Sequence, residues 1–261
     1  MTRKLPVGTC IRHAVNSVRN NISYAFRISW PWYAAIAVLS IAVFAGLGVL
    51  AAGGVLSALH FGVVFLVAIS FVAFAAIAVN WHRYILLDEV PTGGSIFRLD
   101  GHTWRYLGNL LLIGLILFLI SAVIMGPLIA LAANLYSDSV IIAVVIVGLI
   151  FFMILAIFSV RLSVKLPAVA LGRRDFTFSH ALAATRGNSL PVLLLILFQV
   201  ALALGTGMLM FFLEFVTGAI HPIFGFVTGL LAQLFVNWIL TIFGITILTS
   251  LYGFFAEGRD F

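Results

Sequence analysis

Long apolar runs dominate the pattern along this chain. Six windows of about twenty or more mostly apolar residues cover positions 32–50, 56–79, 107–133, 140–160, 191–216 and 226–254. A helix needs about 20 apolar residues to cross a hydrocarbon core of about 30 Å. The runs lack the alternation of apolar and polar residues that membrane β-barrel strands show. The pattern therefore predicts an all-α polytopic integral membrane protein with six transmembrane helices.

Amphipathic stretches separate some of these windows. Near the N-terminus, apolar residues such as Val7, Ile11 and Val18 recur at helical spacing, and Arg12 and Arg19 fall on the opposite face. This pattern is typical of a helix that lies in the plane of the membrane interface. A second such helix is expected farther along the chain, with Asp175 or Thr177 as its N-cap and Gly187 after its end. We therefore expect amphipathic interfacial helices on one face of the membrane.

We expect the chain to form a single membrane domain over residues 1–261. Its parts are an N-terminal amphipathic interfacial segment (1–29), spans one and two (30–88), an interfacial loop (89–106), spans three and four (107–165), an interfacial helix and loop (166–190), and spans five and six with a short tail (191–261). The first apolar run is too long for the 7–15-residue core of a secretory signal. We interpret it as a retained span.

Composition narrows the class of protein. The chain is 64% hydrophobic and 8% charged, whereas soluble domains carry about 25% charged residues. This deficit excludes a soluble enzyme, a nucleic-acid-binding domain and a disordered chain.

Charge predicts orientation. All fourteen Lys and Arg residues fall before span one, between spans two and three, between spans four and five, or after span six. With six spans these segments share one side, and the positive-inside rule makes that side cytoplasmic. We expect both termini in the cytoplasm and the protein in the bacterial cytoplasmic (inner) membrane.

The basic residues near the span ends are candidates for binding anionic lipid. Candidate headgroup contacts are Arg83, Arg161, Lys165, Arg173, Arg174 and Arg186. The alternative is that they only set topology, as any positive-inside protein requires. Membrane lipids with anionic headgroups are thus the expected partners on the cytoplasmic side. A protein partner or a homo-oligomer is a further candidate, and no nucleic acid is expected.

Three amides mark candidate polar positions near the membrane midplane. Gln199 lies about 13 Å into its span, and Gln233 and Asn237 are four residues apart, so they share a helix face. They either line a polar path or hydrogen-bond between helices as packing contacts. The pair Gly225 and Gly229 makes a GxxxG pattern, which permits either dimerisation or close packing within the chain.

No recognised catalytic pattern is present. The sequence has no P-loop, HExxH, CxxC or GxSxG motif, and its one cysteine, Cys10, permits no intramolecular disulfide. We therefore assign no catalytic, cofactor-binding or metal residues, expect no cofactor, and do not expect an enzyme.

Residues 166–198 resemble a pattern from a loose group of bacterial six-helix inner-membrane proteins. The matching residues are Pro167, Ser179, Ala181, Thr185, Gly187 and Asn188. The group includes the membrane domain attached to glycerophosphodiester phosphodiesterases and uncharacterised stand-alone relatives. Ala170, Leu171 and Gly172 stand where the group often has an acidic residue. No phosphodiesterase catalytic domain accompanies the match, so the resemblance implies architecture rather than activity.

Two functions remain open from the sequence. The first is a non-enzymatic inner-membrane protein that organises lipid or partner proteins through a basic cytoplasmic interfacial face. The alternative is a small-molecule or ion transporter that uses the midplane amides.

Overall fold

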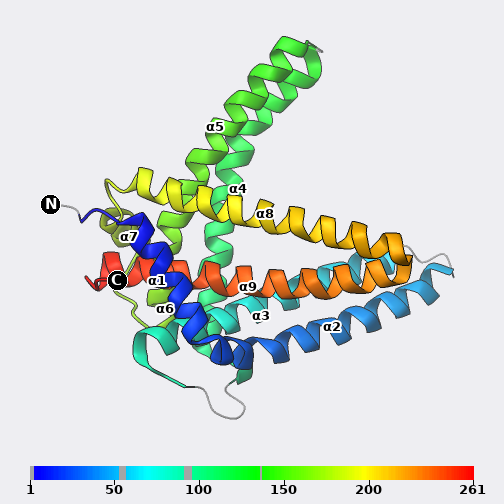
Figure 1. Ribbon diagram of the computed structural model, residues 1–261. Helices are drawn as coiled ribbons and strands as arrows, with labels where there is room; N and C mark the ends of the chain where they lie inside the picture. The colour runs from blue at the N-terminus through cyan, green and yellow to red at the C-terminus, as the bar shows by residue number, and fades with distance from the viewer. Residues whose placement is uncertain (1–2, 53–56, 91–95, 136) are drawn as a thin grey trace. The chain divides into compact units, whose positions relative to one another are not determined.

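A computed structural model gives the fold (Figure 1). It describes residues 3–52, 57–90, 96–135 and 137–261. Six long helices account for most of these residues: α2 (Ile22–Ala52), α3 (Ser57–Leu87), α4 (Gly101–Leu135), α5 (Asp138–Ser163), α8 (Ser189–Ile220) and α9 (Pro222–Ala256). All six are long and apolar enough to cross a membrane, which confirms the predicted all-helical, six-helix architecture. A helix suits this environment because it satisfies its backbone hydrogen bonds internally.

Three short helices complete the described structure: α1 (Val7–Asn20), α6 (Lys165–Ala170) and α7 (Phe178–Ala184). The chain divides into two compact units, which are described separately below. One unit comprises Val18–Leu111 and Leu166–Phe176, and is called the α2–α3 unit here. The other, called the α8–α9 unit, comprises Met1–Ser17, Leu112–Lys165 and Thr177–Phe261. The prediction of a single membrane domain stays a prediction.

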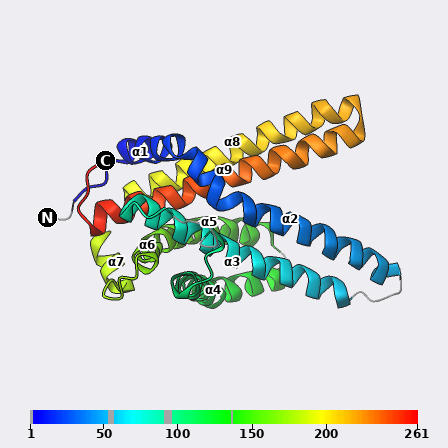
Figure 2. The same ribbon diagram turned by 90° about the horizontal axis from the view of Figure 1, so that it is seen from below.

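The α2–α3 unit is built on an antiparallel pair of long helices (Figures 1 and 2). Its interior near the end of α3 is aromatic: Trp81 is fully buried, and the rings of Tyr24 and Tyr84 stack with centroids 3.7 Å apart. Helix α3 ends where Asp88 adopts a positive φ of 55°. Helix α4 begins after Asp100, whose carboxylate accepts hydrogen bonds from two of its first backbone N–H groups, at 2.9 and 3.1 Å.

Helix α6 closes with a Schellman motif in the same unit. The N–H of Arg173 donates to the carbonyl of Ala168 (2.9 Å), and the N–H of Gly172 donates to that of Val169 (3.0 Å). Gly172 takes φ 79°, which a side chain would strain. The chain therefore turns sharply at this glycine.

The α8–α9 unit is built on a second antiparallel helix pair, seen side by side in both ribbon views (Figures 1 and 2). Helix α5 packs against α8 and α7. The predicted cap of α7 is confirmed for Thr177, whose hydroxyl accepts from the His180 N–H (3.3 Å). Gly187, predicted after the end of that helix, takes φ 76°.

Close contact between α8 and α9 depends on glycine. A Cβ added to Gly225 would lie 2.5 Å from the Cα of Gly218, so the two backbones touch. Gly229, one turn farther along α9, faces the side chain of Glu214. The hydroxyl of Thr228 donates to that of Thr217 (2.8 Å) across the same contact. The GxxxG pair thus packs within the chain.

Helix ends differ from the predicted windows. Helix α2 begins at Ile22, inside the predicted interfacial segment 1–29, and α4 begins at Gly101, inside the predicted loop 89–106. Hydropathy marks where a chain crosses hydrocarbon, whereas helices continue into the polar interface where caps such as Asp100 end them. Residues 91–95 of that loop lie outside the described residues.

Substitution of Gly225 by alanine tests the close helix contact. The new Cβ has no room against the Gly218 backbone, so we expect the variant to lose about 1–3 kcal/mol of stability. Thermal unfolding in detergent measures this loss. Gly205→Ala is the matched control, because a Cβ there meets nothing within 4 Å and alanine favours the helix. Equal stability of Gly225→Ala and wild type would show that the helices are not held this closely.

Candidate functional site: the basic ends of the spans

Arg83, a predicted headgroup contact, is bound within the α2–α3 unit. Its Nε donates to Glu89 Oε2 (2.8 Å), and Nη2 donates to the same oxygen. Its Nη1 donates to the Ala170 carbonyl (3.0 Å) near the end of α6. A carbonyl at a helix C-terminus lacks an intrahelical donor and favours a cation. Arg83 therefore joins α3 to the following loop and to α6.

Glu89 is the centre of this network. Arg98 Nη2 donates to its other oxygen, Oε1, at 2.5 Å, and Arg98 Nε lies 3.4 Å from Asp100 Oδ2. The hydrogen bonds from Arg83, and then the one from Arg98, lower the pKa of the Glu89 carboxyl to about 2, although partial burial opposes this shift. The carboxylate is ionised at neutral pH and holds the segment after α3 to the start of α4.

Arg161, at the end of α5, likewise binds a backbone carbonyl and a side-chain oxygen, here within the α8–α9 unit. Its Nη2 donates to the Leu182 carbonyl (2.7 Å) in α7, and its Nε donates to the hydroxyl of buried Thr185 (2.9 Å). Lys165 lies with Nζ 3.9 Å from the centroid of the Phe178 ring, at the start of α7. The two cations therefore position α7.

The other three predicted headgroup contacts are placed differently. Arg173 and Arg174 are exposed on the turn that follows α6, in the α2–α3 unit. Arg186 is exposed after α7, in the α8–α9 unit. The structure thus separates the six candidates into three that hold local structure and three whose side chains are exposed.

An N-terminal contact escaped the sequence analysis. Within the α8–α9 unit, buried Asn188 accepts from the Leu5 N–H (2.9 Å) and donates to the Arg3 carbonyl (3.0 Å). Lys4 Nζ donates to the Gly187 carbonyl (2.6 Å), and Arg3 pairs with Asp260. We call this contact the terminal clasp. The only sign of it in the sequence is that Asn188 follows Gly187, the glycine expected after a helix end. The sequence does not indicate which residues Asn188 binds.

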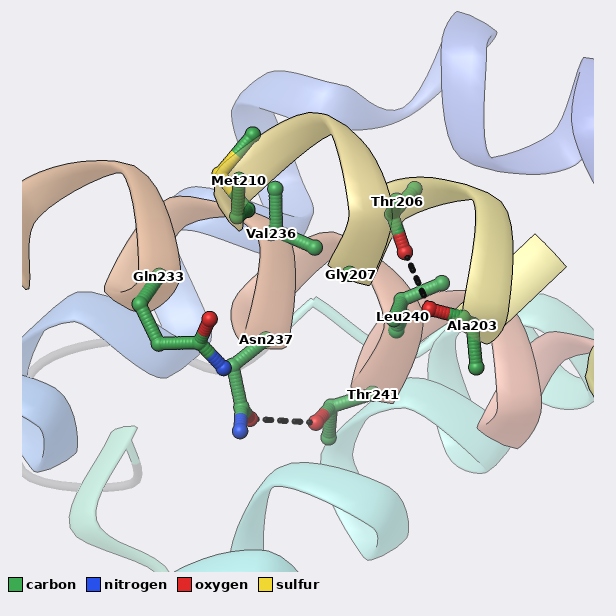
Figure 3. Close-up of a pocket in the computed structure, with 9 residues that line it drawn as sticks. All are labelled: Ala203, Thr206, Gly207, Met210, Gln233, Val236, Asn237, Leu240 and Thr241. Atoms are coloured by element: carbon green, nitrogen blue, oxygen red, sulfur yellow. Dashed lines mark hydrogen bonds between the residues drawn. The ribbon is translucent and has the colours of Figure 1, made fainter. Parts of the chain in front are cut away.

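The predicted midplane amides line two adjoining grooves, which share Ala203 and Leu240. Gln233 and Asn237 line a groove of about 410 Å³ on α8 and α9 with Thr206 and Thr241 (Figure 3). Gln199 lines a neighbouring groove of about 420 Å³ instead. At 1.5 Å per residue, Gln199 lies about 32 Å from the Ile220 end of α8, whereas Gln233 lies about 17 Å from the start of α9. The transporter interpretation stays a prediction.

Metal-binding side chains do not gather in the part of the chain that the structure describes. Across the described ranges, no three His, Cys, Asp or Glu residues lie close enough together to hold an ion.

Changing pH tests the Glu89 network. Because the folded pKa lies below the unfolded value of about 4.3, the ionised carboxylate stabilises the fold above that value. This stabilisation is lost as pH falls from about 5 toward about 2. We expect Glu89→Gln to lower stability at pH 7 by about 1–3 kcal/mol and to flatten this acid-side loss, measured as melting temperature against pH.

Asp88→Asn provides the control for that experiment. Asp88 is exposed one residue away, and asparagine tolerates its positive φ. The control should follow the wild-type pH curve. A pH curve for Glu89→Gln that matched wild type would remove Glu89 from the network.

Comparisons with protein-family models, with curated proteins and with solved structures found no match to the chain. The resemblance of residues 166–198 to the six-helix inner-membrane group stays a prediction. In this structure, three of its matching residues have local roles: Thr185 accepts from Arg161, Gly187 turns the chain, and Asn188 binds residues 3 and 5.

Proposed function

We propose that this chain is a non-enzymatic protein of the bacterial cytoplasmic membrane. Its exposed arginines bind anionic lipid headgroups on the cytoplasmic side, and through them the protein organises lipid or partner proteins there. The observation that carries the proposal is the exposure of Arg173, Arg174 and Arg186 on turns directly beside the long apolar helices. Guanidinium groups suit phosphate because they donate two parallel hydrogen bonds.

The contrast with Arg83 and Arg161 supports this assignment. The guanidinium groups of those two side chains donate hydrogen bonds to carbonyl, hydroxyl and carboxylate groups of the chain. A positive charge near a cytoplasmic leaflet of anionic lipid is worth about 1 kcal/mol of attraction. Arg174 and Arg186 are exposed and can realise this attraction with lipid, whereas the bonded donors of Arg83 and Arg161 contribute mainly structure.

The start of α2 supplies a second line of support. Ile22, Phe26 and Trp30 are each about half exposed, and the rings of Phe26 and Trp30 stack. Arg19 and Arg27 are exposed in the same part of the α2–α3 unit. Exposed aromatic rings beside cations are typical of the headgroup level of a membrane. The distribution of all fourteen basic residues supports the cytoplasmic assignment of these ends.

Lipid selectivity in vesicles tests the proposal. The full chain is reconstituted in phosphatidylcholine with increasing brominated phosphatidylglycerol, and quenching of tryptophan fluorescence reports which lipid surrounds the protein. We expect wild type to prefer phosphatidylglycerol, with the preference weakening as salt screens the charges. The triple variant Arg173→Gln, Arg174→Gln, Arg186→Gln should lose most of this preference.

A matched lysine variant separates charge from structure. Replacement of the same three arginines by lysine keeps their charge, and should retain most of the preference. Arg161→Lys should instead lower melting temperature, because lysine cannot reproduce both guanidinium hydrogen bonds to α7. Equal binding of the two lipids by wild type, or full preference in the glutamine variant, would overturn the proposal.

A further inference from the structure

Two amides lie on an exposed face of the α8–α9 pair. Gln233 and Asn237 point to the same side of α9, into the groove beside Thr241 (Figure 3). Both side chains are exposed. Asn237 Oδ1 accepts a hydrogen bond from the Thr241 hydroxyl (3.3 Å). Within the described part of the chain, the Gln233 amide and the Asn237 NH₂ group have no hydrogen-bond partner.

Their depth makes this exposure costly. Measured from Pro222, Gln233 lies about 17 Å and Asn237 about 23 Å along α9. A hydrocarbon core is about 30 Å thick, so a helix that enters it near Pro222 carries both amides through its middle part. No water is available there to satisfy an amide, and lipid tails offer neither donor nor acceptor. The two amides therefore need a polar partner.

The rest of the chain offers few amide partners. Outside α8 and α9, the amide side chains within the long helices belong to Asn80, Asn109 and Asn134. Each donates to a backbone carbonyl near the end of its helix, at 3.2, 2.8 and 2.7 Å respectively. Gln199 lines the neighbouring groove, about 9–15 Å away along the helix pair. A partner of matching chemistry at the depth of Gln233 is thus another Gln233 or Asn237.

We propose that the face formed by Ala203, Gly207, Gln233 and Asn237 is a homodimer interface within the membrane. A carboxamide both donates and accepts, so two copies related by a two-fold axis satisfy each other reciprocally. Ala203 and Gly207, on α8 beside the amides, let the second copy approach closely. The face carries no charge that would select a partner of opposite sign. This interface is independent of the proposed binding of lipid by the exposed arginines.

Energy transfer between two labelled populations tests the interface. Full chains carrying donor or acceptor dyes are mixed in phosphatidylcholine vesicles and diluted with lipid, which gives a dissociation constant. We expect wild type to dimerise, and Gln233→Leu combined with Asn237→Leu to raise that constant at least about tenfold. Asn134→Leu is the matched control, since it removes an exposed amide of α4 that already donates within its own helix. It should leave the constant unchanged.

Cysteine cross-linking locates the contact. Ala203→Cys should form disulfide dimers on oxidation, whereas Met208→Cys, 74% exposed on another side of α8, should not. The native Cys10 is buried, and burial raises its pKa to about 12, so it does not compete. Circular dichroism confirms that each variant is folded. Gln233→Asn, which keeps a carboxamide at this position, should dimerise, whereas Gln233→Leu should not. Three results would overturn the proposal: monomers at every dilution, a dimer indifferent to the leucine pair, or cross-links only at Met208→Cys. The first would mean that the chain itself or a small ligand covers the groove.

Discussion

The constraint behind this structure is that a backbone carbonyl in an apolar medium needs a donor. The long helices meet it internally, but the short helices α6 and α7 leave carbonyls at their ends without one. Arg83 and Arg161 reach these ends from α3 and α5 and supply the missing donors. Each guanidinium also binds a side-chain oxygen, Glu89 in one case and Thr185 in the other. Each arginine at the end of a long helix thereby connects that helix to a short one, α3 to α6 and α5 to α7.

The same constraint distinguishes two kinds of polar residue in the spans. The threonine hydroxyls of α9, such as Thr246 and Thr249, each donate a hydrogen bond to a backbone carbonyl of their own helix. An amide has more donors and acceptors than its own helix can satisfy, so Gln233 and Asn237 demand a neighbour. Glycine decides where neighbours can be close, as Gly225 does against Gly218. The close contact at Gly225 and the two amides therefore lie at different levels along α9, since Gly225 is three residues from the start of the helix at Pro222 and Gln233 is eleven residues from it.

Sequence reasoning recovers the features whose cause is local. Runs of apolar residues give the six long helices, and Thr177 and Gly187 were found because capping and positive φ restrict residue type strongly. It could not separate Arg161 from Arg186, because both are basic residues beside a span and only tertiary contacts show which guanidinium is already bonded. Spacing likewise put Gln233 and Asn237 on one face. Spacing could not show that Gln199, counted from the Ile220 end of α8, lies farther along the helix pair than Gln233 and Asn237 counted from Pro222.

The terminal clasp has a consequence for biosynthesis. Arg3 and Asp260 are separated by 257 positions, so at roughly 5–20 residues per second the ribosome adds the second partner about 13–50 seconds after the first. During that interval residues 3–5 have neither Asn188 nor Asp260 to bind until each is made. The N-terminal segment therefore lacks these partners while most of α2 to α9 is synthesised. Formation of the clasp is thus a late event that reports completed insertion of α9.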